Sequence, residues 1–221
     1  MCGRFTLRSS PDVLAEQFDI DAFEPYAARY NIAPTQPVFA VIRADDRRVG
    51  HFLRWGLLPS WAKDPRIGSP MINARAETVA EKPSFRAAFR RRRCLIPADG
   101  YYEWAATPAG KQAWFIHRPD DACFAFAGLW EHWEHDGTVI ESCAILTCAA
   151  NARLSAIHDR MPVVIEPADY TLWLASEQAA PAPSALLRAM NDDFFALRRV
   201  TKRVNSPRND GPDCILPATD P

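Results

Sequence analysis

The second residue of the chain, Cys2, would carry two adjacent nucleophiles once Met1 is removed. It lies in the start Met1-Cys2-Gly3-Arg4-Phe5, where a small second residue favours removal of the initiator methionine. The α-amine of a terminal cysteine has a pKa near ~8 and its thiol a pKa near ~8.5. The amine can condense with an aldehyde, and the thiol can then close the imine into a five-membered thiazolidine. For Cys2 taken alone, a cysteine that follows the initiator by chance is the commoner interpretation.

Three polar residues inside apolar segments are further candidates for catalysis. Glu103 lies between two aromatic residues, where burial would raise its pKa towards the range useful for acid–base catalysis; a strand residue facing solvent is the alternative. His158 is able to donate a proton near pH 7, and the alternative is a histidine that caps the preceding helix. Asn73 is able to hydrogen-bond a developing oxyanion or a substrate hydroxyl, or it is a turn residue.

Basic residues are concentrated in one window that aromatic residues flank. Arg75, Lys82 and Arg86 precede an arginine run at 90–93, and tryptophans and tyrosines lie on both sides. A single-stranded nucleic-acid groove requires arginines that bind phosphates and rings that stack on bases. A solvated helix end is an equally supported alternative. A second basic cluster either extends this face or is unrelated to it, and it comprises Arg198, Arg199, Lys202, Arg203 and Arg208.

The sequence gives little support for a metal site, a phosphate-binding loop or a serine-hydrolase motif. His132 and His135 lie near Glu131 and Glu134, but we expect all four in a solvated loop around a hairpin turn, without cysteine partners. The chain has neither a glycine-rich phosphate loop nor a GxSxG motif. We therefore expect no metal and no cofactor.

Composition narrows the class of protein. The 221 residues include 48% hydrophobic and 24% charged residues, which is typical of a globular protein. The net charge of −1 gives no overall attraction to nucleic acid, so such affinity must come from a local patch. No window is apolar enough for a membrane helix, and no secretion signal is apparent. The six cysteines lack CxxC spacing and mostly lie in apolar runs, which indicates reduced, buried residues of a cytoplasmic protein.

The elements that must position these residues are mainly strands. Residues 38–43 and 49–54 flank a charged turn and predict a hairpin. Ser10 and Pro11 predict a helix start. Further strands are expected at 94–104, 113–117, 124–130 and 139–148, and further helices at 82–92, 151–157, 167–175 and 184–190. Without a βαβ rhythm, this order predicts one α+β domain over 1–221, with an antiparallel, barrel-like sheet and peripheral helices.

Seven segments together closely resemble the SOS-response-associated peptidase (SRAP) family. The match covers nearly the whole chain in order. The segments are Met1-Cys2-Gly3-Arg4-Phe5, Tyr30-Asn31-Ile32-Ala33-Pro34, Trp55-Gly56-Leu57-Leu58-Pro59, Asn73-Ala74-Arg75-Ala76-Glu77-Thr78, Lys82-Pro83-Ser84-Phe85, the run from Arg93 to Trp104, and Ile157-His158-Asp159-Arg160-Met161-Pro162.

The resemblance implies a sensor of abasic sites in single-stranded DNA. Its mature terminal cysteine would form a thiazolidine crosslink with the ring-opened sugar and so shield the lesion. The family name also implies a peptidase-like act, in which the protein removes the residue before the cysteine. We expect a monomer that binds DNA and no membrane, and that is cytoplasmic or nucleoid-associated when bound to damaged DNA.

The resemblance also implies a role for each motif residue. Cys2 would be the nucleophile, Glu103 would move protons during imine formation, His158 would help to open the sugar, and Asn73 would orient the aldehyde or the cysteine. Phosphate contacts would come from Arg4, Arg75 and Arg86. Trp104 and Trp61 would stack on bases at the lesion.

Two other classes of function remain open. In an N-terminal-nucleophile thiol amidohydrolase or peptidase, Cys2 would attack an amide and Asn73 would stabilise the oxyanion. That class has no use for phosphate-binding arginines beside the nucleophile. In a non-catalytic DNA-binding module, replacing Cys2 by alanine would leave function intact.

Overall fold

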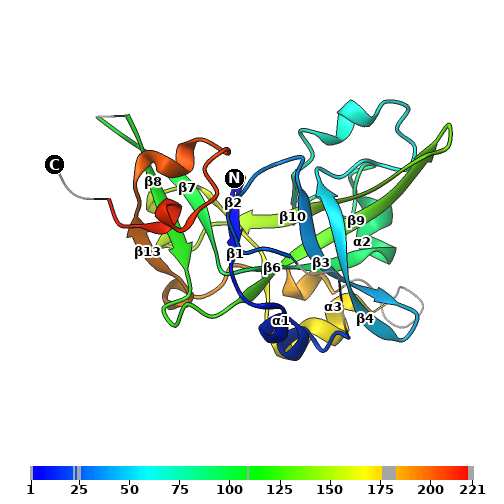
Figure 1. The fold of residues 1–221 in the computed structure, drawn as a ribbon. Coiled ribbons are helices and arrows are strands. Elements are labelled where there is room, and N and C mark those ends of the chain that lie inside the picture. The colour runs from blue at the N-terminus through cyan, green and yellow to red at the C-terminus, as the bar shows by residue number, and fades with distance from the viewer. Residues whose placement is uncertain (1, 22, 24–25, 109, 176–182, 219–221) are drawn as a thin grey trace.

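A closed five-stranded barrel forms one part of the structure (Figure 1). The computed structural model describes residues 2–21, 23, 26–108, 110–175 and 183–218. The barrel closes because the strand at 138–149 pairs on one side with the strand at 47–55 and on the other side with the strand at 124–135. In order around the barrel, its strands are β10 (Thr138–Ala149), β4 (Arg47–Trp55), β3 (Pro37–Ala44), β6 (Arg93–Ala98) and β9 (Phe124–His135).

A second sheet lies beside the barrel and contains the first strand of the chain. Figure 1 places β1 and β2 between the barrel strands and the outer strands β7, β8 and β13. The strand order is β13 (Ala196–Arg199), β8 (Gly110–His117), β7 (Gly100–Thr107), β1 (Phe5–Leu7) and β2 (Arg29–Ile32). The expected α+β fold is confirmed, but the barrel is not purely antiparallel, because β4 and the short strand β5 (Asn73–Arg75) run parallel to β10.

The chain passes from the barrel to the second sheet at Asp99 and Gly100. The predicted continuous strand over 94–104 is therefore wrong, since it divides into β6 and β7. The buried Asp99 carboxylate accepts hydrogen bonds from the backbone of Ser9 and from its hydroxyl, which fixes the chain at this point. A Cβ atom on Gly100 would lie 2.4 Å from the ring of Phe115, so the close approach of β7 and β8 requires glycine here.

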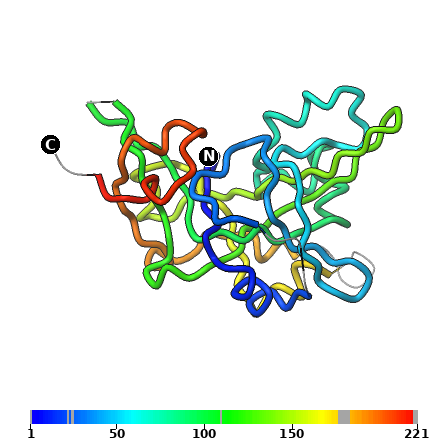
Figure 2. Tube along the Cα trace, viewed as in Figure 1, coloured from blue at the N-terminus to red at the C-terminus, as the bar shows by residue number. Residues whose placement is uncertain are grey.

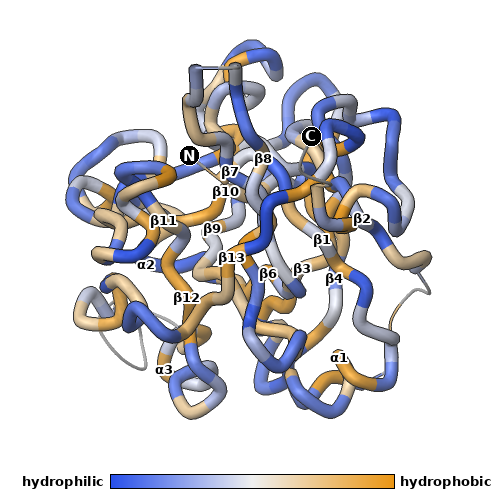
Figure 3. Tube along the Cα trace, turned by 90° about the vertical axis from the view of Figure 1, so that its left-hand side faces the viewer, coloured by the Kyte–Doolittle hydropathy of each residue, from blue (hydrophilic) through white to orange (hydrophobic). Residues whose placement is uncertain are grey.

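Aromatic packing attaches β1 to the barrel. Phe5 is fully buried, and its ring makes edge-on contacts with Trp55 at 5.2 Å and Phe126 at 5.8 Å between centroids. Such ring pairs add to the stabilisation that burial of the large side chains provides. In Figure 3 the hydrophobic segments follow the inner strands, and many of the surrounding loops are hydrophilic. The start of the chain is thus held against the main hydrophobic core.

The helices are short and peripheral. The predicted helix start at Ser10 is confirmed: its hydroxyl accepts from the Val13 amide at 3.4 Å, at the head of α1 (Pro11–Phe18). The predicted helices at 151–157 and 184–190 are wrong, since each contains only one 3-10 turn. The other helices are α2 (Arg86–Arg91) and α3 (Tyr170–Leu174), and the remaining short strands are β11 (Arg160–Pro162) and β12 (Val164–Ile165). In the described part of the chain, no helix is long and apolar enough to cross a membrane.

A buried asparagine fastens the C-terminal segment to β2. In Figure 2 this segment, coloured orange to red, lies beside the second sheet. The side-chain amide of Asn31 donates to the backbone oxygens of Val204 at 3.1 Å, Ser206 at 3.0 Å and Asn209 at 2.8 Å. Its Oδ1 accepts from Arg4 at 2.9 Å. Asn31 is fully buried, so its side chain is a well-satisfied polar connection between two distant parts of the sequence.

We predict that Asn31→Ala lowers the free energy of unfolding by about 2 to 4 kcal/mol, because it leaves backbone oxygens of the C-terminal segment without donors. Urea denaturation followed by circular dichroism measures this change. A change below about 0.5 kcal/mol, the size usual for surface substitutions, would contradict a role for Asn31 in fastening this segment.

Candidate active site and nucleic-acid interface

Cys2 lies buried at the point where the chain enters the second sheet. Its exposed fraction is 1%. The Asn73 side-chain amide donates to the Cys2 carbonyl oxygen at 2.9 Å, and the Tyr102 amide donates to the Arg4 carbonyl oxygen at 3.0 Å. These bonds and the pairing of β1 fix the position of the first residues relative to β5 and β7. Two candidate residues 71 positions apart, Cys2 and Asn73, are thereby in direct contact.

Burial shifts the proton affinity of the Cys2 thiol. Loss of solvation raises its pKa well above the ordinary value, and the nearby Glu103 carboxylate raises it further. A backbone hydrogen bond from Arg4 opposes this effect. The ordinary thiol pKa assumed from the sequence is therefore wrong for the folded protein. The thiol is kept in its neutral form at neutral pH.

Glu103 faces the interior and not the solvent. It belongs to β7, and its exposed fraction is 4%, so the interpretation as a solvent-facing strand residue is wrong. Burial raises the pKa of its carboxyl group, and the nearby His158 opposes part of this increase. Cys2, Glu103 and His158 consequently form one electrostatically coupled group.

His158 lies on the short connection between a 3-10 turn and β11. The Arg160 amide donates to its Nδ1 at 3.0 Å, so Nδ1 is the acceptor and Nε2 is the ring nitrogen left to donate. A carboxylate oxygen of Asp159 lies 2.9 Å from the same nitrogen. The His158 side chain is 28% exposed and lines a pocket with Glu103. This geometry suits a group that exchanges protons with a ligand.

Glu103 and His158 line an open pocket of about 600 Å³ together with aromatic and cationic side chains, whereas Cys2 and Asn73 are not among its lining residues. β1 pairs in register with β7 at Gly100 and Tyr101, and two later residues of β7, Glu103 and Trp104, line the pocket. The pocket is lined by Gly3, Arg4, Pro34, Glu103, Trp104, Lys111, His158 and Asn205. It thus combines acid–base groups with an indole and two cations.

The predicted DNA-binding residues do not all reach this pocket. Arg4 and Trp104 line it, and the Arg4 guanidinium lies 5.9 Å from the centre of the Trp104 ring. Arg75 is exposed on β5, two positions after Asn73 and on the same side of that strand. Trp61 is 57% exposed, and its indole nitrogen donates to the carbonyl oxygen of Pro83 at 3.4 Å. Arg86 is exposed at the start of α2. Arg75, Trp61 and Arg86 are not among the residues that line the pocket.

Much of the arginine run has a structural role. Arg93 is 4% exposed and donates to the carbonyl oxygens of Phe89 at 2.7 Å and Trp173 at 2.6 Å, so it caps the ends of α2 and α3. Arg92 pairs with the buried Glu131 at 2.6 Å. The alternative that this run serves a helix end is therefore correct for Arg93. Neither Arg92 nor Arg93 is among the residues that line the pocket.

The histidines near the hairpin lie on a strand. His132 and His135 belong to β9, and the turn follows at Asp136 and Gly137, so the predicted loop position is wrong. Their solvent exposure agrees with the sequence-based interpretation. Among the residues that the structure describes, no group of three or more histidine, cysteine or acidic residues is placed to hold a metal ion. All six cysteines are unpaired and buried.

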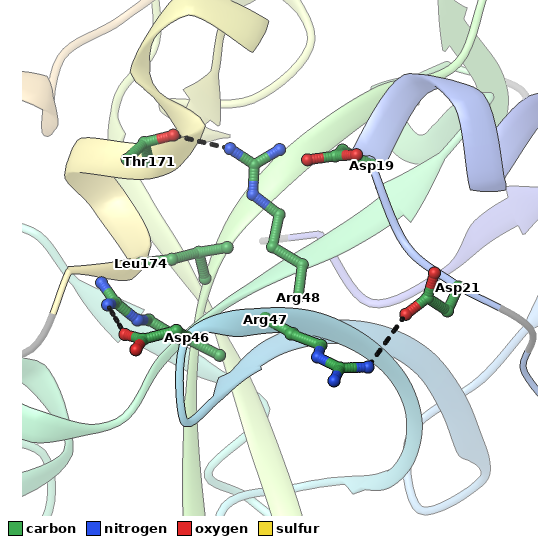
Figure 4. Close-up of a pocket in the computed structure, with 8 residues that line it drawn as sticks. Asp19, Asp21, Asp46, Arg47, Arg48, Thr171 and Leu174 are labelled. Atoms are coloured by element: carbon green, nitrogen blue, oxygen red, sulfur yellow. Dashed lines mark hydrogen bonds and ion pairs between the residues drawn. The ribbon is translucent and has the colours of Figure 1, made fainter.

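A second cavity, of about 360 Å³, lies away from this chemistry, between α1, the β3–β4 hairpin and α3 (Figure 4). Its arginines contact other side chains of the cavity: Arg47 lies 3.7 Å from Asp21, and Arg48 donates to the Thr171 hydroxyl at 2.6 Å. Arg43 pairs with Asp46 at 2.9 Å. Three arginines and three aspartates line it, so it presents no net charge to a ligand.

Four residues of the pocket were not predicted from the sequence: Gly3, Pro34, Lys111 and Asn205. Gly3 and Pro34 lie in segments that resemble the family, which is a usable signal. Lys111 and Asn205 come from the start of β8 and the end of a 3-10 turn, far from every motif. Only the tertiary fold brings them to the site.

The chain resembles proteins that process abasic sites. A family model described as "SOS response associated peptidase (SRAP)" matches residues 1–207. Abasic site processing protein YoqW of Bacillus subtilis is 44% identical over 222 residues, which cover 97% of this chain and 99% of YoqW. Abasic site processing protein YedK of Escherichia coli is 31% identical and covers 98% of this chain, with 100% of YedK covered.

Solved structures show the same architecture. A protein from Bacteroides thetaiotaomicron superposes with a TM-score of 0.89 at 23% identity, over 99% of this chain and 100% of that one. A phage-related protein from Bordetella bronchiseptica gives 0.71 at 29% identity, over 90% and 94% of the two chains.

We predict that Glu103→Gln stabilises the protein at neutral pH. The pKa of Glu103 is raised in the folded protein. Its contribution to the free energy of unfolding is therefore fully present below the unfolded pKa of about 4.3 and is lost as the pH rises through the folded pKa. The variant should therefore have the higher Tm at pH 8, by a few degrees, with little difference at pH 4. Thermal unfolding across this range measures the effect.

Glu77→Gln is the matched control with the opposite sign. Two hydrogen bonds from Arg160 lower the pKa of Glu77, so its contribution is present above the unfolded pKa and is lost on acidification. Glu77→Gln should be slightly less stable than the parent at pH 8. A Glu103→Gln variant that is also less stable at pH 8 would contradict the buried, raised-pKa state of Glu103.

Proposed function

Because the chain belongs to the SOS response associated peptidase family, we propose that it captures abasic sites in single-stranded DNA through a covalent bond to Cys2. The names of its relatives point to abasic-site processing, and the pocket supplies groups suited to that substrate. The observation that carries the proposal is the burial of Cys2 against Asn73 and Glu103, beside a pocket that Arg4 and Trp104 line.

The crosslink forms in two balanced steps after Met1 is removed. The Cys2 amine attacks C1′ of the ring-opened sugar, a C–N bond forms, and the aldehyde oxygen leaves as water. The Cys2 sulfur then adds to the imine carbon, and the thiol proton passes to the imine nitrogen. The product is a thiazolidine, and its mass is the sum of protein and DNA less one water.

Glu103 and His158 supply the proton transfers. The raised pKa of Glu103 favours its acid form, which protonates the departing oxygen during imine formation. His158 protonates the ring oxygen of the closed sugar as the C1′–O4′ bond breaks, and the C1′ hydroxyl passes its proton to solvent, which releases the aldehyde. Its Nδ1 accepts from the Arg160 amide, which leaves Nε2–H as the donor.

Asn73 orients the nucleophile. Its amide nitrogen holds the Cys2 carbonyl, while its Oδ1 is buried and accepts no hydrogen bond from a described residue. A buried acceptor without a donor is costly in the absence of a ligand. The freed amine of Cys2 or a hydroxyl of the sugar satisfies it.

Arg75 and Arg4 bind phosphates, and Trp104 stacks on a base. Arg75 is exposed next to the Asn73 position, whereas Arg4 already donates to Asn31 and Val204 and so contributes mainly its charge. Arg86 and Trp61 lie on another segment and contact DNA that extends beyond the pocket.

The family name adds a cysteine-peptidase step in which one water hydrolyses the Met1–Cys2 bond and frees the amine.

Intact-mass spectrometry tests this function. The purified protein is weighed before and after incubation with a single-stranded oligonucleotide that carries one abasic site. We expect loss of Met1 and then a denaturant-resistant product of protein plus oligonucleotide less one water. Cys2→Ala should give no such product while keeping its fold.

A trimmed and folded protein that gives no adduct would contradict covalent capture. That outcome would favour the N-terminal-nucleophile amidohydrolase, and peptide substrates would then be the next assay. An adduct that persists in Cys2→Ala would place the nucleophile on another residue.

A further inference from the structure

The indole of Trp104 is held in one orientation at the pocket wall. Its Nε1 donates to the Asn205 side-chain oxygen at 2.8 Å, and the Arg4 guanidinium lies over the ring at 5.9 Å. The side chain is only partly buried, so part of the ring faces the pocket. A tryptophan fixed in this way presents a preformed stacking surface, which lowers the entropic cost of binding.

The partner of the indole is itself held in place. Asn205 ends a 3-10 turn that Thr201 caps, and its carbonyl oxygen lies 3.5 Å from an Arg4 nitrogen. The preceding residue, Val204, accepts hydrogen bonds from both Arg4 and Asn31. The orientation of Trp104 therefore depends on the attachment of the C-terminal segment to β2.

A cation lies beside this ring on the neighbouring strand. In the β7–β8 register, Trp104 opposes Ala113 and Ala106 opposes Lys111, so Lys111 is the diagonal neighbour of Trp104 on the same sheet face. Diagonal neighbours are about 7 to 8 Å apart, within reach of long side chains. Lys111 is exposed and lines the pocket. An aromatic face and a flexible ammonium group thus point into one space.

We infer that Lys111 and Asn205 extend the stacking role proposed above for Trp104 into a subsite for one whole nucleotide next to the abasic site, an inference that rests on the proposed function. The base of that nucleotide stacks on the Trp104 indole, and its phosphate binds the Lys111 ammonium group. Asn205 is a positioning residue that acts through Trp104. Stacking and charge pairing do not depend on base identity, so the subsite accepts any flanking sequence.

Equilibrium binding to an abasic analogue tests the subsite independently of the crosslinking chemistry. The probe is a fluorescent single-stranded oligonucleotide with one tetrahydrofuran residue, which lacks the aldehyde. We expect Lys111→Met to raise its Kd about 3- to 10-fold and to reduce the slope of log K against log salt by about 0.7, the value for one phosphate on a single strand. Lys111→Arg should bind like the parent.

Lys202→Met is the matched control. It removes the same charge from an exposed lysine that does not line the pocket, and it should bind like the parent. An unchanged Kd for Lys111→Met, or an equal loss for Lys202→Met, would overturn the role of Lys111.

A double-mutant cycle tests the role of Asn205. Asn205→Ala should weaken binding about 3-fold in the parent and leave it unchanged in a Trp104→Phe background, because phenylalanine has no N–H for Asn205 to hold. The Trp104 indole N–H resonance should also shift in Asn205→Ala. An equal loss in both backgrounds would show that Asn205 does not act through Trp104.

A second probe separates stacking from phosphate binding. Where both neighbours of the lesion are also tetrahydrofuran residues, no base is available to stack. The effect of Asn205→Ala should then vanish, and that of Lys111→Met should remain. Persistence of the Asn205→Ala effect would overturn the subsite, whereas failure of the parent protein to crosslink a true abasic site would overturn only the proposed function.

Discussion

The structure depends on the burial of the first residues of the chain between two sheets. Cys2 is nearly inaccessible, and Phe5 lies in the main core against barrel residues. β1 pairs with β7 on one side and β2 on the other, and the contacts of Phe5 with Trp55 and Phe126 join this second sheet to the barrel. The fold therefore gives the N-terminal segment a fixed position, which a terminal nucleophile needs.

The same burial sets the protonation states of the site. Loss of solvation raises the pKa of both the Cys2 thiol and the Glu103 carboxyl, so their neutral forms are favoured in one low-dielectric space. A carboxylic acid that retains its proton is suited to expelling water as an imine forms. The burial of an ionisable group costs stability at neutral pH, which is typical of functional sites.

Local signals predicted several features well. The hairpin of β3 and β4 and the start of α1 follow from turn and capping residues that act within a few positions. The resemblance identified Cys2, Asn73, Glu103 and His158, and the structure brings these four together. The buried side of Glu103 was not predictable, because alternation along a strand does not say which face meets the core.

Features that depend on long-range contacts were not predicted. The division of one apolar run at Asp99 and Gly100 depends on Ser9 and Phe115. Arg93 reads as a surface cation in the sequence, but it is buried because carbonyl oxygens at the end of α3, about eighty positions away, are placed to accept from it. Asn205 reaches the pocket only because Asn31 fastens the C-terminal segment, and no local pattern encodes that connection.

The most direct test of the central claim locates the crosslink on Cys2. The adduct with abasic DNA is digested with nuclease, treated with iodoacetamide and protease, and sequenced by tandem mass spectrometry. A thiazolidine predicts a sugar-phosphate remnant on the N-terminal peptide and a Cys2 sulfur that resists alkylation. An alkylated Cys2 sulfur, or a remnant on Lys111 or another lysine, would contradict the account.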